Sequence, residues 1–133
     1  MDGYFEWRKH PDSKVKTPYY LTGADGQPLA AAGLYELWAD PTKAQDDPTR
    51  WMWTCAVITT TATDSTGHIH DRSPLLLPQD IIDTWLDPLL IDSEHVRALV
   101  ASVPRQHLVP RIVGPAVGNV RNDGPHLIEP VEA

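Results

Sequence analysis

Thirteen prolines are spread along the 133 residues of this chain, and they limit its possible folds more than any other feature. Proline lacks a backbone donor and breaks the interior of helices and of central strands, so long uninterrupted elements do not fit this sequence. Eight glycines add further points at which the chain can turn tightly. The sequence therefore predicts many short elements joined by tight turns.

Length and composition indicate one globular domain, or a large piece of one. Hydrophobic residues make up 41% and charged residues 22%, close to globular averages, which excludes a disordered chain. No apolar run approaches the ~18 residues of a membrane span, and no signal-peptide pattern is present. Cys55 is the only cysteine. This excludes an internal disulfide framework and a cysteine-built zinc site, and it favours a reducing, cytoplasmic setting.

Most of the first part of the chain has the composition of strands. Five segments rich in aromatic, β-branched or apolar residues are expected to be strands: 3–8, 17–21, 29–38, 51–61 and 74–77. Segment 29–38 is also compatible with a helix by composition. Segment 51–61 is the strongest, and its apolar run predicts burial on both faces. Asp25-Gly26 predicts a hairpin turn, while 40–50 and 62–67 read as polar loops.

The later part of the chain has the apolar period of helices. A helix over about 79–87 would carry four apolar residues on one face: Ile81, Ile82, Trp85 and Leu86. A second helix is predicted from Ser93, as its N-cap, to about residue 102. Segments 108–113 and 127–130 read as two more strands. Strands with helices clustered late indicate the α+β class.

Residues 68–72, His-Ile-His-Asp-Arg, are the densest polar cluster. In an extended chain His68 and His70 point the same way, and with an acid they give half of a metal site, but no third ligand at a fitting spacing is visible. Two surface histidines on a solvated turn also explain the cluster. A third interpretation makes one histidine a general acid or base partnered by distant Glu6, which otherwise lies on the exposed face of an edge strand.

Other reactive residues have ordinary explanations. Cys55 lies in the most apolar strand, which predicts a buried, inert thiol. Thr59 to Thr61 end that strand and offer hydroxyls to a phosphate or to the backbone. The basic residues, Arg105 among them, are scattered without a nucleic-acid stripe, and the net charge of −7 by itself argues weakly against a nucleic-acid partner.

Seven segments, taken in order, share a more specific pattern: Asp2–Trp7, Pro18–Tyr20, Ala32–Trp38, Ile58–Thr60, Ile69–Pro74, Trp85–Asp87 and Val117–Val120. Together they resemble the SRAP family of SOS-response-associated peptidases, which sense abasic sites in single-stranded DNA. The most specific part is His-Asp-Arg-x-Pro at 70–74, following a strand that ends in Thr-Thr. The resemblance covers the whole chain but only roughly the C-terminal three-fifths of the family's domain.

The resemblance implies a chemistry that depends on an N-terminal cysteine. Family members expose it as residue two, and its amine and thiol close the aldehyde of an abasic site into a thiazolidine, a covalent DNA–protein crosslink. They also have self-processing peptidase activity. Here Met1 precedes Asp2, and the family's Cys-Gly-Arg and Asn-Ala-Arg-x-Glu motifs are absent. The chain alone is therefore expected to be inactive in crosslinking, and whether it is an enzyme stays open. No cofactor or metal is implied.

Four residues match family site residues. The resemblance makes Glu6 the active-site glutamate and His70 the active-site histidine, a proton donor or acceptor at the sugar. It makes Arg72 a DNA-backbone contact and Thr59 a phosphate contact. The implied partner is single-stranded DNA with abasic sites, and the implied location is the cytoplasm, in association with the nucleoid.

We therefore expect a single partial SRAP domain over 1–133, from an incomplete gene model, a split gene or a trimmed chain. Its predicted fold is a mostly antiparallel, incomplete barrel or sheet over 4–77 with two helices packed outside. An unpaired apolar strand edge would favour self-association, and Glu6 and His70 should converge on one concave surface. A non-enzymatic interaction module that pairs with a separate N-terminal chain is the alternative function, followed by a histidine-based metallohydrolase.

Overall fold

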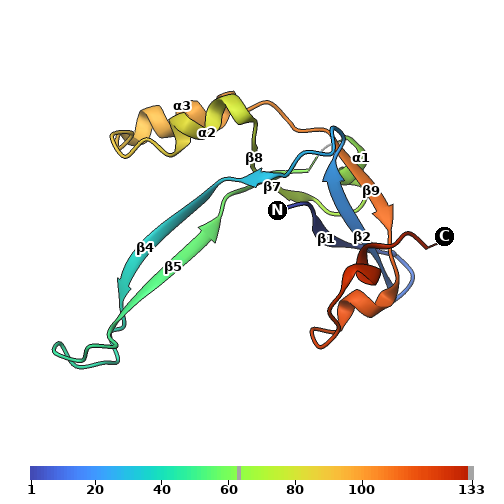
Figure 1. The fold of residues 1–133 in the computed structure, drawn as a ribbon, viewed down its shortest axis with the longest axis horizontal. Helices are drawn as coiled ribbons and strands as arrows, with labels where there is room; N and C mark the ends of the chain where they lie inside the picture. The colour runs from blue at the N-terminus through green and yellow to red at the C-terminus, as the bar shows by residue number, and fades with distance from the viewer. Residues whose placement is uncertain (63, 132–133) are drawn as a thin grey trace.

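The computed structural model describes residues 1–62 and 64–131 as an open α+β fold built from small antiparallel sheets (Figure 1). The strands are β1 (Tyr4–Lys9), β2 (Lys16–Gly23), β3 (Ala30–Ala31), β4 (Gly33–Ala39), β5 (Trp51–Val57), β6 (Thr59–Thr61), β7 (Arg72–Pro74), β8 (Leu76–Leu77) and β9 (Leu108–Ile112). The helices are α1 (Asp64–Gly67), α2 (Gln79–Trp85) and α3 (Ser93–Ser102), followed by 3-10 turns η1 (Pro115–Gly118) and η2 (Pro125–Ile128). The predicted class is confirmed, and the described strands do not close into a barrel. Among these residues, no helix has the length and apolarity to cross a bilayer.

The largest sheet is three-stranded, with β2 between β1 and β9 and both pairings antiparallel. Tyr19, Tyr20 and Leu21 at the centre of β2 are buried. Tyr19 and Leu21 join a core cluster that also holds Ile69 and Leu108. This cluster ties the sheet to the segment after α1, and so it positions the polar residues that follow Ile69.

Three two-stranded ribbons meet at a junction closed by backbone hydrogen bonds. Single residues separate β3 from β4, β5 from β6 and β7 from β8: Ala32, Ile58 and Leu75. They form a closed cycle in which Ala32 N donates to Leu75 O (2.8 Å), Leu75 N to Ile58 O (2.8 Å) and Ile58 N to Ala32 O (2.9 Å). From this junction the pairs β3–β8, β4–β5 and β6–β7 diverge. The junction explains why the predicted strand 51–61 is two strands that pair with different partners.

The two predicted helices pack beside the junction. Ile81, Ile82 and Trp85 of α2 contact a second buried cluster that contains Ala32 and Leu77. The predicted apolar face is thus correct for these three residues.

Two details at the helix ends differ from the prediction. Leu86 caps the C-terminus of α2 and is 68% exposed. The N-cap of α3 is Asp92, whose carboxylate accepts from the amides of Glu94 and His95, so Ser93 is already the first helical residue.

The long hairpin of β4 and β5 corrects the prediction of a strand buried on both faces. It extends away from the body of the molecule (Figure 1), and every residue of β5 is exposed, Cys55 included. The prediction of a buried thiol is therefore wrong. Apolar composition does not bury a strand by itself, since burial needs a second layer, and in the described residues nothing covers β5.

Three further sequence predictions are corrected by the pairing. Gly26 has a φ of 70°, as a tight turn requires. However, β2 and β3 do not pair across this turn, because β3 pairs with β8 instead. Residues 62–67 include the one-turn helix α1 rather than a loop alone, with residue 63 outside the described chain. In segment 127–130, Leu127 and Ile128 are the second half of η2, and Pro130 forms only an isolated bridge with Val113.

Candidate nucleic-acid interface

Tyr4 connects β1 to the segment that carries the predicted site. Its hydroxyl lies 3.1 Å from the Ser73 Oγ on β7. Burial raises the pKa of Tyr4; the Ser73 hydrogen bond opposes this, and the nearby Glu6 carboxylate adds to it. Sequence reasoning missed this contact, because no local signal relates two residues 69 positions apart.

Glu6 lies two residues after Tyr4 and therefore on the same face of β1. Its Oε1 accepts a hydrogen bond from the Trp7 amide at 3.1 Å. Its cross-strand partner is Tyr19, and the ring of Tyr19 meets His68 edge-on, with centroids 6.3 Å apart. Glu6 is only half-buried, so its carboxylate is available on the face that looks toward the histidine segment.

His70 is held in a turn by its backbone and by its ring. Its amide donates to Thr66 O at 3.1 Å, and its Nδ1 accepts from the Arg72 amide at 3.0 Å. Nδ1 also lies 3.3 Å from Arg72 O, which can only accept, so these contacts fit either tautomer of the neutral ring. Asp71 Oδ1 is 3.2 Å from Nδ1 and pairs with the ring when it is protonated. His70 thus has a half-exposed ring whose Nδ1 faces the Arg72 backbone and the Asp71 carboxylate.

Arg72 and Thr59, predicted separately as DNA contacts, bind each other. The Arg72 Nε donates to Thr59 Oγ1 at 3.2 Å, and Nη2 donates to Thr59 O at 3.0 Å and also to Thr59 Oγ1. Both residues are exposed. Several bonds to one residue fix the plane of the guanidinium while its charge faces solvent. Such a fixed fork suits a phosphate.

The histidine segment does not form the extended metal half-site considered from the sequence. His68 and His70 follow α1 in a turn rather than a strand, and their rings have the different partners described above. Within residues 1–62 and 64–131, no group of three or more His, Cys, Asp or Glu side chains is placed to hold a metal ion.

The structure brings Glu6 and His70 to neighbouring elements without joining them. Tyr4 and Ser73 link β1 to β7, three residues after His70. In the described part of the chain, Glu6 and His70 share no hydrogen bond. Their pairing as acid and base therefore stays a prediction.

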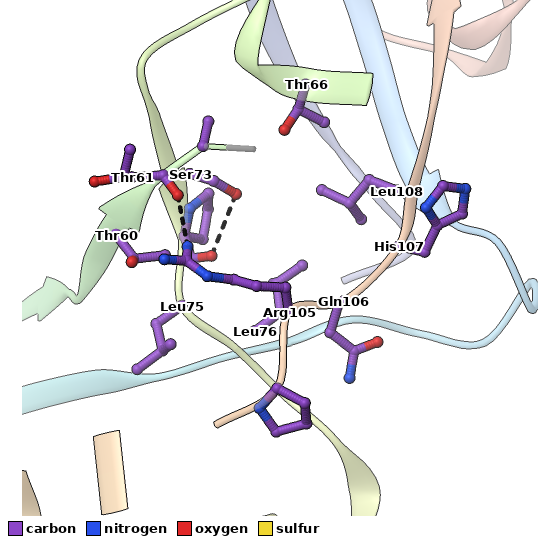
Figure 2. Close-up of a pocket in the computed structure, with 13 residues that line it drawn as sticks. Thr60, Thr61, Thr66, Ser73, Leu75, Leu76, Arg105, Gln106, His107 and Leu108 are labelled. Atoms are coloured by element: carbon purple, nitrogen blue, oxygen red, sulfur yellow. Dashed lines mark hydrogen bonds between the residues drawn. The ribbon is translucent and has the colours of Figure 1, made fainter. Parts of the chain in front are cut away.

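A small hollow lies beside this region, under the side chain of Arg105 (Figure 2). Its volume is about 30 Å³, and hydroxyl-bearing residues of β6, β7 and α1 line it together with Arg105. Arg105 lies between α3 and β9, and its Nη1 donates to Thr61 O at 2.5 Å. No sequence pattern predicted this contact, which spans 44 positions.

Comparison with known proteins agrees with this arrangement of segments. The profile of the family described as SOS response associated peptidase (SRAP) matches residues 1–120. Abasic site processing protein YoqW of Bacillus subtilis is 31% identical over 128 residues, which are 96% of this chain and 54% of that protein. Abasic site processing protein YedK of Escherichia coli is 33% identical over 132 residues, 98% of this chain and 55% of that protein.

A solved structure shows the same fold. The crystal structure of a protein from Bacteroides thetaiotaomicron superposes with a TM-score of 0.77 at 26% identity, covering 99% of this chain and 55% of that one. The chain belongs to the SRAP family. It spans about half the length of the relatives that it matches, and curated relatives of this family are named as abasic site processing proteins.

Proposed function

We propose that this chain binds single-stranded DNA carrying abasic sites, without forming a covalent bond to it. The observation that carries the proposal is the Arg72 guanidinium fixed on Thr59 at an exposed strand. A guanidinium in a fixed plane offers directed, charge-assisted hydrogen bonds to phosphate oxygens. Such contacts hold a strand in place without reading its bases. The names of the relatives support abasic DNA as the target.

The same proposal gives Glu6 and His70 the acid and base roles at the lesion. The His70 ring would donate a proton to an oxygen of the opened sugar or accept one from it, and the Glu6 carboxylate would accept a proton on the facing strand. The contacts of Nδ1 with the Arg72 backbone support a fixed orientation of this ring. These residues would assist a nucleophile and are not themselves one.

Cys55 does not provide that nucleophile for a thiazolidine. A thiazolidine needs a free α-amine and a thiol on the same residue, whereas the nitrogen of mid-chain Cys55 is an amide. Cys55 also lies on β5, which pairs with β4 and is not part of the β6–β7 pair that carries Thr59 and Arg72. The proposed function is therefore binding alone for these 133 residues.

One experiment separates binding from crosslinking. The chain is incubated with a fluorescent abasic single strand, and the mixture is divided between anisotropy measurement and a denaturing gel. We expect binding that weakens steeply with salt, because phosphate contacts release counterions, and no band that survives denaturation. Arg72→Gln should weaken binding, while Arg97→Gln, at an exposed position of α3, should not. A crosslink that disappears in Cys55→Ala would overturn the proposal.

A second candidate function, an interaction module, is favoured by the hairpin β4–β5. Tyr35 and Trp53 are 76% and 72% exposed, and they share one face of the ribbon with Leu37, Trp51 and Val57. A contiguous apolar face of this kind marks a protein contact in soluble proteins. A groove of about 300 Å³ between the base of β4 and Trp85 extends the apolar surface toward α2. We propose that this face pairs with a second polypeptide.

Sedimentation velocity of the isolated chain tests this candidate. A concentration-dependent dimer that Trp53→Glu abolishes would identify a second copy as the partner, with Lys14→Glu as an exposed control outside the hairpin. A monomer at all concentrations would exclude self-association. A separate chain that begins Cys-Gly-Arg would then be tested for complex formation. If the chain neither self-associates nor binds that second chain, the interaction-module proposal is rejected.

A further inference from the structure

The outer edge of β6 carries two guanidinium groups. Ile58 O accepts from Leu75 N and Ala62 N donates to Asp71 O, so the even-numbered residues of this segment bond toward β7. Alternate residues of an antiparallel strand face opposite edges, and the carbonyls of Thr59 and Thr61 therefore point to the outer edge. Arg72 donates to the first of these carbonyls and Arg105 to the second.

Their spacing follows from strand geometry. Two carbonyls two residues apart on a strand that rises about 3.3 Å per residue are separated by about 6.6 Å. This separation suits successive phosphates of an extended single strand. The two arginines come from different parts of the chain, 33 positions apart in sequence (105 − 72), and only the fold aligns them.

Both guanidinium groups retain free donors. A guanidinium has five N–H donors. Arg72 uses its Nε and Nη2, and Arg105 uses its Nη1. In the described part of the chain, neither arginine forms an ion pair, although the net charge of the chain is −7. Two neighbouring cations without a carboxylate repel each other, and an anion bound between them would relieve this repulsion.

The hollow beneath Arg105 restricts what can bind there. At about 30 Å³ it has room for about one water molecule and excludes a nucleobase or a sugar. Figure 2 shows Arg105 stretched across the hollow toward Thr61. A ligand at this edge therefore contacts the guanidinium groups from outside, as a phosphodiester backbone does.

We propose that Arg105 is a second phosphate contact, one nucleotide along the strand from the phosphate held by Arg72. The single strand then runs along the outer edge of β6 with its phosphates toward Arg72 and Arg105. This inference rests on the proposed DNA binding and adds to it the path of the strand. It also explains how an acidic chain binds DNA through a local pair of cations.

Salt dependence of binding gives the first test. Each phosphate contact on a single strand contributes about −0.7 to the slope of log K against log salt. We expect Arg105→Gln to make the slope shallower by about 0.7, Arg72→Gln to do the same, and the double variant to lose about 1.4. Arg105→Lys should keep most of the slope, and Arg97→Gln all of it. Circular dichroism checks that each variant is folded, and Arg105→Met, which also removes the charge, carries the test if Arg105→Gln is not folded.

A double-mutant cycle with the DNA locates the contact. Methylphosphonate groups, which lack the phosphate charge, are placed singly along the strand. Neutralising the phosphate that Arg105 contacts should weaken binding of the natural chain and of Arg72→Gln, but not of Arg105→Gln. Neutralising the neighbouring phosphate, which Arg72 contacts, should weaken binding of the natural chain and of Arg105→Gln, but not of Arg72→Gln. If Arg105→Gln behaves like Arg97→Gln while Arg72→Gln weakens binding, Arg105 is not a contact and the proposed function stands. If the natural chain does not bind single strands, both proposals fail.

Discussion

At the scale of single residues, Tyr4 shows how the site is tied to the core. It packs against the cluster of Leu21 and Ile69, and it reaches Ser73 with its hydroxyl. Burial is the main reason for its raised pKa. Tyr4 thus links the β1–β2–β9 sheet to the β6–β7 ribbon through Ser73, and its pKa is also raised by the nearby Glu6 carboxylate.

This contact predicts a pH dependence of stability. Because the pKa of Tyr4 is higher in the folded chain than in the unfolded chain, the unfolded state loses this proton first as pH rises. The free energy of unfolding should therefore fall as pH increases above about 10. Tyr4→Phe should cost about 0.5–1.5 kcal/mol at pH 7 through the lost hydrogen bond, and the difference from the natural chain should narrow at alkaline pH. Urea unfolding at both pH values checks this, and a constant difference would contradict it.

The sequence named individual residues for the site, whose roles stay predictions, but it did not predict their contacts. The resemblance pointed to Glu6, Thr59, His70 and Arg72, and the structure joins three of these, because Arg72 binds both Thr59 and His70. The resemblance did not indicate Arg105. This residue is one of several scattered basic residues, and its role depends on a contact with Thr61, 44 positions away in the sequence. Sequence reasoning misjudged Cys55 because burial depends on what other elements cover a strand, which composition does not encode.

At the scale of elements, the junction of three ribbons organises the fold. Ala32 is fully buried there, with 0% exposure, and its neighbours are two further backbone segments. Periodicity predicted both helices well, since an amphipathic face is a local property. It could not show that strand 51–61 divides at Ile58. The division arises because the residues before Ile58 pair with β4 and those after it pair with β7, and these partners are distant in the sequence.

The junction predicts a sharp contrast between two alanines. Ala32→Val adds two methyl groups where the backbone bonds leave no space, and it should destabilise the chain by about 1–3 kcal/mol. Ala56→Val, on the exposed hairpin strand β5, should change stability by less than about 0.5 kcal/mol. Equilibrium urea denaturation measures both. Equal effects of the two substitutions would show that the junction is not tightly packed.

At the scale of the whole molecule, stability is unevenly distributed. The sheet of β1, β2 and β9 has a buried central strand, whereas the hairpin β4–β5 is an isolated two-stranded ribbon with exposed faces. Two-stranded ribbons are marginal in water on their own. The resemblance predicted an unpaired apolar strand edge, and in the described residues β4 and β5 pair only with each other.

Hydrogen exchange should report this division. In dilute solution, amides of residues 51–57 in β5 should exchange much faster than those of Tyr19 to Leu21 in β2, because their local opening free energy is lower. Mass spectrometry of peptides from both strands gives the comparison. Uniform protection across the two strands in a monomeric sample would contradict it. Protection that rises in β5 alone with protein concentration would support pairing through the hairpin.

The cycle of Ala32, Ile58 and Leu75 has a consequence for how the chain could be reconnected. All three of its hydrogen bonds are made at the base of the hairpin, while the polar loop over residues 40–50 lies at its far end (Figure 1). A cut in that loop leaves one piece that carries Ala32 and another that carries both Ile58 and Leu75. The backbone cycle, together with the core clusters, would hold the two pieces together. Exposed polar loop tips are the sites where circular permutation usually succeeds. Here the loop tip is separated from the outer edge of β6, the proposed DNA-binding edge, by the whole length of the hairpin β4–β5. The molecule could therefore receive new termini, or an inserted domain, without disturbing the residues that meet the DNA.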